Sequence, residues 1–77
     1  MINRIQVKMA RAAVGWGVRD LASKAGVAAN TVSRYENGAD ALGDTLARIQ
    51  RALEEAGVVF IDQNEESGPG VRLKDPI

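Results

Sequence analysis

Hydrophobic residues in the first half of the chain recur at spacings of three and four, which is the period of an amphipathic helix. The first such segment covers about residues 3–14. The apolar positions that we expect it to turn toward a core are Ile2, Ile5, Met9, Ala12 and Ala13. Two shorter patterns follow over 18–25 and 30–36, and they end at Gly26 and Gly38. The pattern therefore predicts three helices before residue 39.

The second half shows the strongest periodicity, with apolar residues that step by four, three, four and three. They are Leu42, Leu46, Ile49, Leu53 and Ala56. A fourth helix is expected from about Asp44, with Gly57 just past its end, where a left-handed residue is common. The β-branched run 58–61 and the alternating run 71–73 predict two short strands joined by a polar loop. The fold class is thus mainly α, a compact four-helix bundle with a short C-terminal β-strand pair.

Residues 18–38 have small and apolar residues where two short, steeply crossing helices need them. Ala22 keeps the first of these helices narrow, Gly26 makes the turn, and Val32 faces back from the second. The positions left on the outward face of the second helix are Ala28, Ala29, Asn30, Ser33, Arg34 and Asn37. Asparagine pairs with adenine and arginine with guanine in bidentate geometry. Asn30 and Arg34 are therefore the candidates for reading bases in a major groove.

The runs 21–27 and 30–38 resemble the Xre family of helix-turn-helix regulators, which is similar to the lambdoid phage repressors and Cro. The resemblance covers about residues 5–56. It implies a bundle of four or five helices that binds DNA and regulates transcription, often as a dimer. The family's ion pair between its first helix and the end of its third falls on Arg11 and Glu36. Its base-contacting positions fall on Ala29, Asn30 and Arg34, and its phosphate-contacting positions on Val18, Thr31 and Asn37.

Two positions depart from the family pattern. Val18 stands where most members have a phosphate-binding glutamine, so it can offer only its backbone N–H. Ala29 can touch a thymine methyl group but cannot donate or accept a hydrogen bond. To the implied contacts we add Ser33 at the bases, and Arg19 and Lys24 at the phosphates.

Two residues have alternative interpretations. An exposed Arg11–Glu36 pair would contribute almost nothing to stability, whereas a buried pair would join the first helix to the recognition helix. We favour the partly buried pair. Trp16, flanked by two glycines, is expected to be a core or lid residue between the first two helices rather than a platform for a nucleobase.

Composition excludes several functions. The chain has 77 residues with no cysteine and no histidine, so a disulfide, a thiolate nucleophile and an ordinary zinc site are all absent. A domain of this size cannot enclose a deep catalytic cleft, and no carboxylate pair accompanies a nucleophile, so we expect no enzyme and no cofactor. Asp62, Glu65 and Glu66 fit a solvated loop better than a metal site.

The formal net charge of zero conceals two unlike halves. Residues 1–38 contain six basic and two acidic side chains, which gives 6 − 2 = +4, and residues 39–77 contain four basic and eight acidic ones, which gives 4 − 8 = −4. The basic half can bind phosphate locally. No apolar run reaches the length of a membrane span or a signal peptide, so we expect a cytoplasmic protein with no membrane partner.

These patterns together predict a sequence-specific regulator of transcription, a repressor that binds double-stranded DNA with the helix 30–36 in the major groove. Residues 1–57 would form the helix-turn-helix domain. Residues 58–77 would form the strand pair, either as an internal hairpin or as a sheet between subunits. A homodimer through these strands or the fourth helix is expected. The alternative is a protein-interaction module, such as an antitoxin or a regulator-binding domain, without a DNA target of its own.

Overall fold

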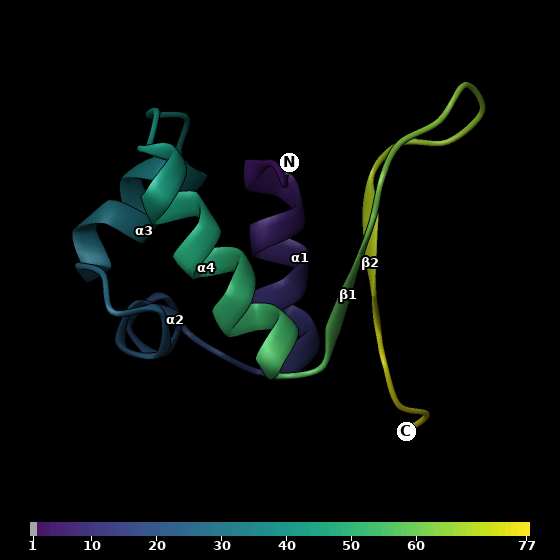
Figure 1. Ribbon diagram of the computed structural model, residues 1–77, viewed down its shortest axis with the longest axis horizontal. Coiled ribbons are helices and arrows are strands. Elements are labelled where there is room, and N and C mark those ends of the chain that lie inside the picture. The colour runs from purple at the N-terminus through teal and green to yellow at the C-terminus, as the bar shows by residue number, and fades with distance from the viewer. Residues whose placement is uncertain (1) are drawn as a thin grey trace.

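The computed structural model describes residues 2–77, and within this range the chain forms four helices followed by two strands (Figure 1). The elements are α1 (Arg4–Val14), α2 (Val18–Ala25), α3 (Ala29–Glu36), α4 (Gly43–Glu55), β1 (Val58–Ile61) and β2 (Gly70–Leu73). The mainly helical class with a C-terminal strand pair is confirmed. None of the helices in the described range is long and apolar enough to cross a membrane.

Side-chain caps and glycines determine where the helices begin and end. Asn3 and Gln6 form a reciprocal capping box at the start of α1: the Gln6 N–H donates to Asn3 Oδ1 at 2.9 Å, and the Asn3 N–H donates to Gln6 Oε1 at 3.0 Å. At the start of α2, Gly17 N–H donates to Asp20 Oδ2 at 2.8 Å. Gly26 ends α2 with a φ of 72°, a left-handed conformation that disfavours other residues.

The helices and the first strand share one hydrophobic core. Its largest fully buried side chains come from four helices: Val7, Leu21, Val32, Ile49 and Leu53. Val58 of β1 is also buried, and Phe60 and Val71 pack against the same cluster from the two strands. The two strands therefore pack against the helical core and do not extend away from it as a separate element.

The prediction of which α1 residues face the core was largely wrong. Ile2 is buried, but Ile5 is 59% exposed, Ala12 and Ala13 are also exposed, and Met9 is only half-buried. The residues that α1 buries are instead Gln6, Val7 and Ala10. The face is rotated because α1 packs against α3, α4 and both strands, and the strands supply hydrogen-bond acceptors for the buried Gln6 amide.

The apolar series expected for α4 extends one residue too far at each end. Leu46, Ile49 and Leu53 are buried, but Leu42 is 77% exposed and Ala56 is also exposed. Leu42 is the N-cap residue and Ala56 the C-cap residue. At these positions the chain enters or leaves the helix, so the helical period no longer determines which way a side chain points.

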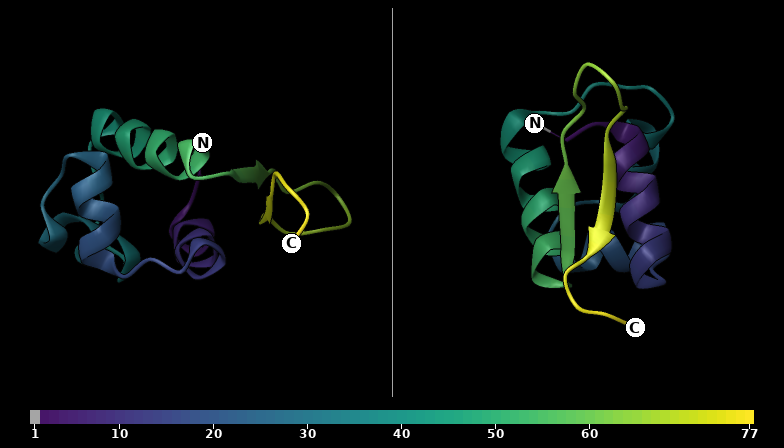
Figure 2. Two further views of the ribbon diagram at one scale, coloured as in Figure 1. Left: turned by 90° about the horizontal axis from the view of Figure 1, so that it is seen from below. Right: turned by 90° about the vertical axis from the view of Figure 1, so that its right-hand side faces the viewer.

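The two strands pair with each other, which decides between the two arrangements left open by the sequence. They form an antiparallel hairpin in which Val58 is opposite Leu73 and Ile61 is opposite Gly70. The hairpin lies across the bundle, with β1 over α4 and β2 over α1 (Figure 2, right). The buried Gln6 amide fastens it there: Nε2 donates to the carbonyl oxygens of Ile61 and Gly70, both at 3.1 Å.

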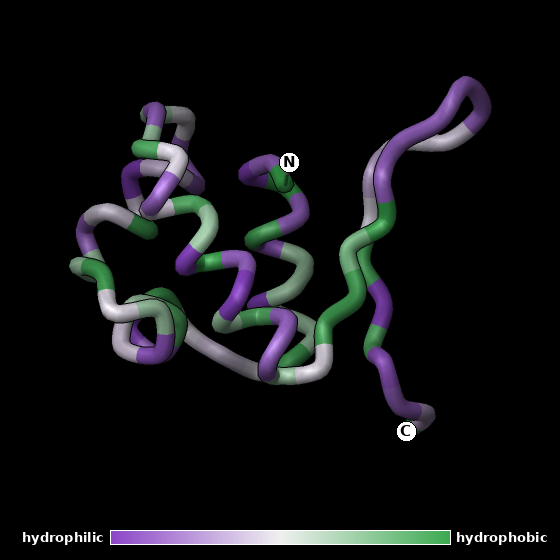
Figure 3. Tube along the Cα trace, viewed as in Figure 1, coloured by the Kyte–Doolittle hydropathy of each residue, from purple (hydrophilic) through white to green (hydrophobic). Residues whose placement is uncertain are grey.

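The hairpin and the pair α2 and α3 lie at opposite ends of the molecule. The Cα trace measures 33 × 28 × 18 Å, and its longest axis runs from α2 and α3 to the hairpin (Figure 1). The trace changes from hydrophobic along β1 to hydrophilic in the loop between the strands, which extends beyond the helices (Figure 3). One end of the molecule therefore presents the short helices and the other presents a small sheet.

Candidate nucleic-acid interface

The crossing of α2 and α3 depends on a tight turn and on small buried residues. The Val27 N–H donates to the Ala22 carbonyl oxygen at 3.0 Å across the left-handed Gly26. Ala22 and Ala25 are buried on α2 where α3 approaches, and Val32 is buried on α3. This packing fixes α3 by its inner side and leaves the opposite side open to solvent.

The open side of α3 is a stripe of polar residues, which we call the α3 stripe: Asn30, Ser33, Arg34 and Asn37. Asn30, Arg34 and Asn37 are exposed and Ser33 is half-buried, whereas Val32 and Tyr35 are buried. Within residues 2–77, none of the four side chains of the stripe takes part in a hydrogen bond or an ion pair. Their donors and acceptors are therefore available to another molecule.

Other expected contacts lie at the edges of this stripe. Ala29 and Val18 are half-buried and pack against the core, so each offers mainly its backbone and a small part of its side chain. Thr31 is half-buried and lines a depression of about 260 Å³ together with Arg34 and Asp40. Arg19 is exposed on the first turn of α2.

Lys24 lies apart from this group. It lines two depressions on the α4 side of α2, both of which also include Ala52 and Glu55 of α4. Thr31 and Arg34 therefore line one depression beside α3, whereas Lys24 lines two other depressions beside α4.

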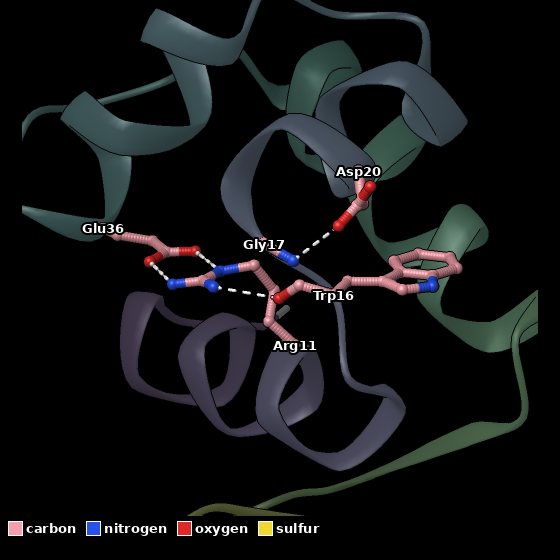
Figure 4. Close-up of polar contacts among 5 residues, drawn as sticks. All are labelled: Arg11, Trp16, Gly17, Asp20 and Glu36. Atoms are coloured by element: carbon pink, nitrogen blue, oxygen red, sulfur yellow. Dashed lines mark hydrogen bonds and ion pairs between the residues drawn. The ribbon is translucent and has the colours of Figure 1, made fainter.

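The predicted pair of Arg11 and Glu36 is present and is partly buried (Figure 4). Arg11 donates from Nε to Glu36 Oε2 and from Nη2 to Oε1, both at 2.7 Å, and from Nη1 to the Trp16 carbonyl oxygen at 3.1 Å. The Glu36 side chain is 5% exposed and the Arg11 side chain 22%. Hydrogen bonding to Glu36 raises the pKa of Arg11, although burial opposes this shift. One guanidinium thus joins α1, the following linker and the end of α3.

A second arginine of α1, which the sequence pattern did not identify, holds the C-terminal end of α3. Arg4 donates from Nε to the Tyr35 carbonyl oxygen at 3.1 Å and from Nη2 to the Gly38 carbonyl oxygen at 3.2 Å. Its guanidinium carbon also lies 5.6 Å from the centre of the Tyr35 ring. Arg4 and Arg11 are seven residues apart, two helical turns, so this spacing could have shown that they share a face.

Trp16 packs against the core from the linker between α1 and α2, as a core or lid residue would. Its indole points away from the Arg11–Glu36 pair (Figure 4), and it lines a depression of about 190 Å³ with Ala52 and Ala56 of α4. The ring therefore lies beside α4 rather than only between α1 and α2.

Two short helices joined by a tight turn, the second with a free polar stripe, define a helix-turn-helix DNA-binding domain. The model of the helix-turn-helix family matches residues 7–56, which is more than half of the chain. The protein belongs to this Xre-like helix-turn-helix family, that of the lambda repressor and Cro, whose members bind DNA and regulate transcription. No match was found among curated proteins.

Proposed function

We propose that the protein is a transcriptional repressor that binds double-stranded DNA at a specific sequence, as a homodimer, with α3 in the major groove. The observation that carries this proposal is the α3 stripe, whose polar side chains are presented together and have no partner within residues 2–77. Residues 1–57 bind DNA and residues 58–77 serve dimerisation. The protein acts in the cytoplasm.

Sequence choice comes from the middle of the α3 stripe. Asn30 and Arg34 are four residues apart on an exposed helical face, so both side chains reach the same groove. Arg34 recognises guanine and Asn30 recognises adenine, each by two parallel hydrogen bonds, while Ser33 and Ala29 make smaller contacts beside them.

Contacts to phosphates fix the position of α3 on the duplex without reading its sequence. The groups that make them surround the α3 stripe: the backbone N–H at Val18 and the side chains of Arg19, Thr31 and Asn37. The backbone N–H groups of the first turn of a helix suit an anion, because they have no partner within the helix and carry the positive end of its dipole. Lys24 reaches a phosphate outside the groove occupied by α3.

The test is the affinity for a selected operator and for a scrambled duplex, measured by fluorescence anisotropy over a salt series. Arg34→Ala should weaken operator binding by about 1 to 3 kcal/mol and relax the choice at one base pair, because a bidentate guanine contact is lost. Lys24→Ala should weaken binding to both duplexes equally. It should also lower by about one the slope of the logarithm of affinity against the logarithm of salt concentration.

The matched control is Lys8→Ala, which removes a positive charge from the exposed surface of α1, outside both the proposed DNA contacts and residues 58–77. It should leave the preference for the operator unchanged. If Arg34→Ala lowers the affinity for both duplexes equally, Arg34 does not read bases directly. An unmodified protein that binds neither duplex at low salt would favour the alternative, a protein-interaction module such as an antitoxin.

A further inference from the structure

The segment that joins α3 to α4, residues 37–42, is fastened to α3 itself (Figure 1). The Ala39 N–H donates to the carbonyl oxygen of Arg34 at 2.9 Å. Two residues later, Ala41 packs against the hydrophobic core. Asp40 lies between these two attachments, so its backbone has a set position relative to Arg34.

Asp40 places a carboxylate at the edge of the α3 stripe. It is exposed and lines the depression of about 260 Å³ that Arg34 and Thr31 also line. Within residues 2–77, the side chains of Asp40 and Arg34 take part in no hydrogen bond and no ion pair. Two opposite charges therefore share one depression, and neither is held by another group of the described chain.

A carboxylate at this place opposes DNA binding in general. A duplex carries one negative charge per about 1.7 Å of its axis, so phosphates approach the protein wherever α3 enters the groove. Thr31, one of the proposed phosphate contacts, lines the same depression as Asp40. A phosphate at Thr31 is repelled by the Asp40 carboxylate, whatever the sequence of the duplex.

Arg34 can bind a duplex in two ways, and a neighbouring carboxylate affects them differently. The guanidinium has five N–H donors, and a guanine edge takes two of them. Because guanine is uncharged, a carboxylate can accept from the remaining donors at the same time. A phosphate is negatively charged, so it competes with the carboxylate for the guanidinium and is also repelled by it. The carboxylate thus favours guanine over phosphate as the partner of Arg34.

We propose that Asp40 determines specificity by positioning Arg34 for guanine and by disfavouring contacts of Arg34 with the phosphates of other sequences. Asp40 is a positioning residue, because it acts through the guanidinium and not through a base contact of its own. Part of the preference for the operator then comes from a penalty on the wrong duplexes. This inference rests on the proposed function, in which Arg34 reads a base.

The test is Asp40→Asn, which keeps the shape of the side chain and removes its charge. At about 0.1 M salt, the affinity for a scrambled duplex should rise about threefold, because the repulsion of phosphates is lost. The affinity for the selected operator should fall about threefold, because Arg34 loses its positioning partner. The preference for the operator therefore falls about tenfold. Asp40→Glu, which keeps the charge, should retain most of the preference.

The matched control is Asp44→Asn. Asp44 is also exposed, but it pairs with Arg48 and lines the depression that contains Lys24, away from the α3 stripe. Its loss should raise the affinity for both duplexes by the same factor and leave the preference unchanged. If Asp40→Asn and Asp44→Asn change the preference equally, or if Asp40→Asn leaves it unchanged, the proposal is overturned.

A double-mutant cycle with Arg34→Ala tests whether Asp40 acts through Arg34. In that background Asp40→Asn should raise both affinities equally, because no guanidinium remains to be positioned. A further fall in preference there would overturn the proposal, and so would a lowered urea midpoint of Asp40→Asn, which indicates a structural effect. If Arg34→Ala weakens operator binding but Asp40→Asn leaves the preference unchanged, the proposed function stands and only this inference fails. A chain that binds neither duplex overturns both.

Discussion

At the scale of single residues, the position of α3 depends on two arginines of α1. Arg11 holds Glu36 and the Trp16 carbonyl oxygen, and Arg4 holds the Tyr35 and Gly38 carbonyl oxygens. Both act on the C-terminal end of α3. The α3 stripe is therefore oriented by contacts at the C-terminal end of the helix.

Arg11→Met should lower the free energy of unfolding by about 3 kcal/mol, because it leaves Glu36 charged and nearly buried without a partner. The control is Arg48→Met. Arg48 pairs with Asp44 at 3.2 Å, but these side chains are 56% and 80% exposed, so the loss should be below about 1 kcal/mol. Urea denaturation of both variants measures the difference. Equal losses would show that the buried pair contributes no more than the surface pair.

The burial of Tyr35 predicts that the protein loses stability at alkaline pH. Burial raises the pKa of Tyr35 above its ordinary value of 10.0, and the charge of Arg4 opposes this shift. The folded state thus favours the neutral phenol, and the stability that this contributes is fully present below pH 10 and falls as the pH rises above it. The slope from one group cannot exceed about 1.4 kcal/mol per pH unit.

The measurement is the free energy of unfolding from pH 9 to 11.5 in the wild type and in Tyr35→Phe. The variant cannot ionise at this position, so its stability should fall less steeply above pH 10. Parallel curves would mean that Tyr35 does not contribute to the alkaline loss.

At the scale of elements, the hairpin is fastened to α1 by one buried amide. Gln6 is 2% exposed, and its Nε2 bridges the last residue of β1 and the first of β2. Its Oε1 accepts from the Asn3 N–H, so the same side chain also caps α1. The first turn of α1 therefore joins the hairpin to the helical bundle, and its Arg4 extends the connection to α3.

Gln6→Met, which keeps the length of the side chain but removes its amide, should cost about 1 to 3 kcal/mol. Amide exchange should accelerate in β1 and β2 more than in α4, because the hairpin loses its bridge to α1. Gln50→Met is the control: Gln50 bonds only to the exposed Glu54, and its loss should stay within about 0.5 kcal/mol. Unchanged protection of the hairpin would show that apolar packing alone holds it.

At the scale of the whole molecule, the proposed dimer makes DNA binding depend on the spacing of half-sites. Inserting about 5 bp, half a helical turn, between the half-sites turns the second one to the opposite side of the duplex. The proposed dimer cannot then contact both, and affinity should fall to that of a single half-site. Anisotropy titrations with inserted and native operators measure this. Equal affinity for both duplexes would show that the protomers bind independently.

Local sequence patterns were enough to predict the elements and the helix-turn-helix. Spacings of three and four predicted each helix to within about a residue, and Ala22, Gly26 and Val32 predicted that α2 and α3 pack together across a tight turn. These are local properties, because the period of an element, its cap and its turn residue are all determined by neighbours along the chain. The pair of Arg11 and Glu36 was found through the family resemblance.

How the elements face one another could not be predicted from local patterns and follows from the packing of the whole chain. The buried face of α1 includes Gln6 and excludes Ile5 because the hairpin, about 55 residues later in the chain, supplies acceptors for an amide. The strands pair within one subunit although their sequences also suited pairing between two. Each of these outcomes depends on contacts between distant segments, which the hydrophobic period of a single segment does not contain.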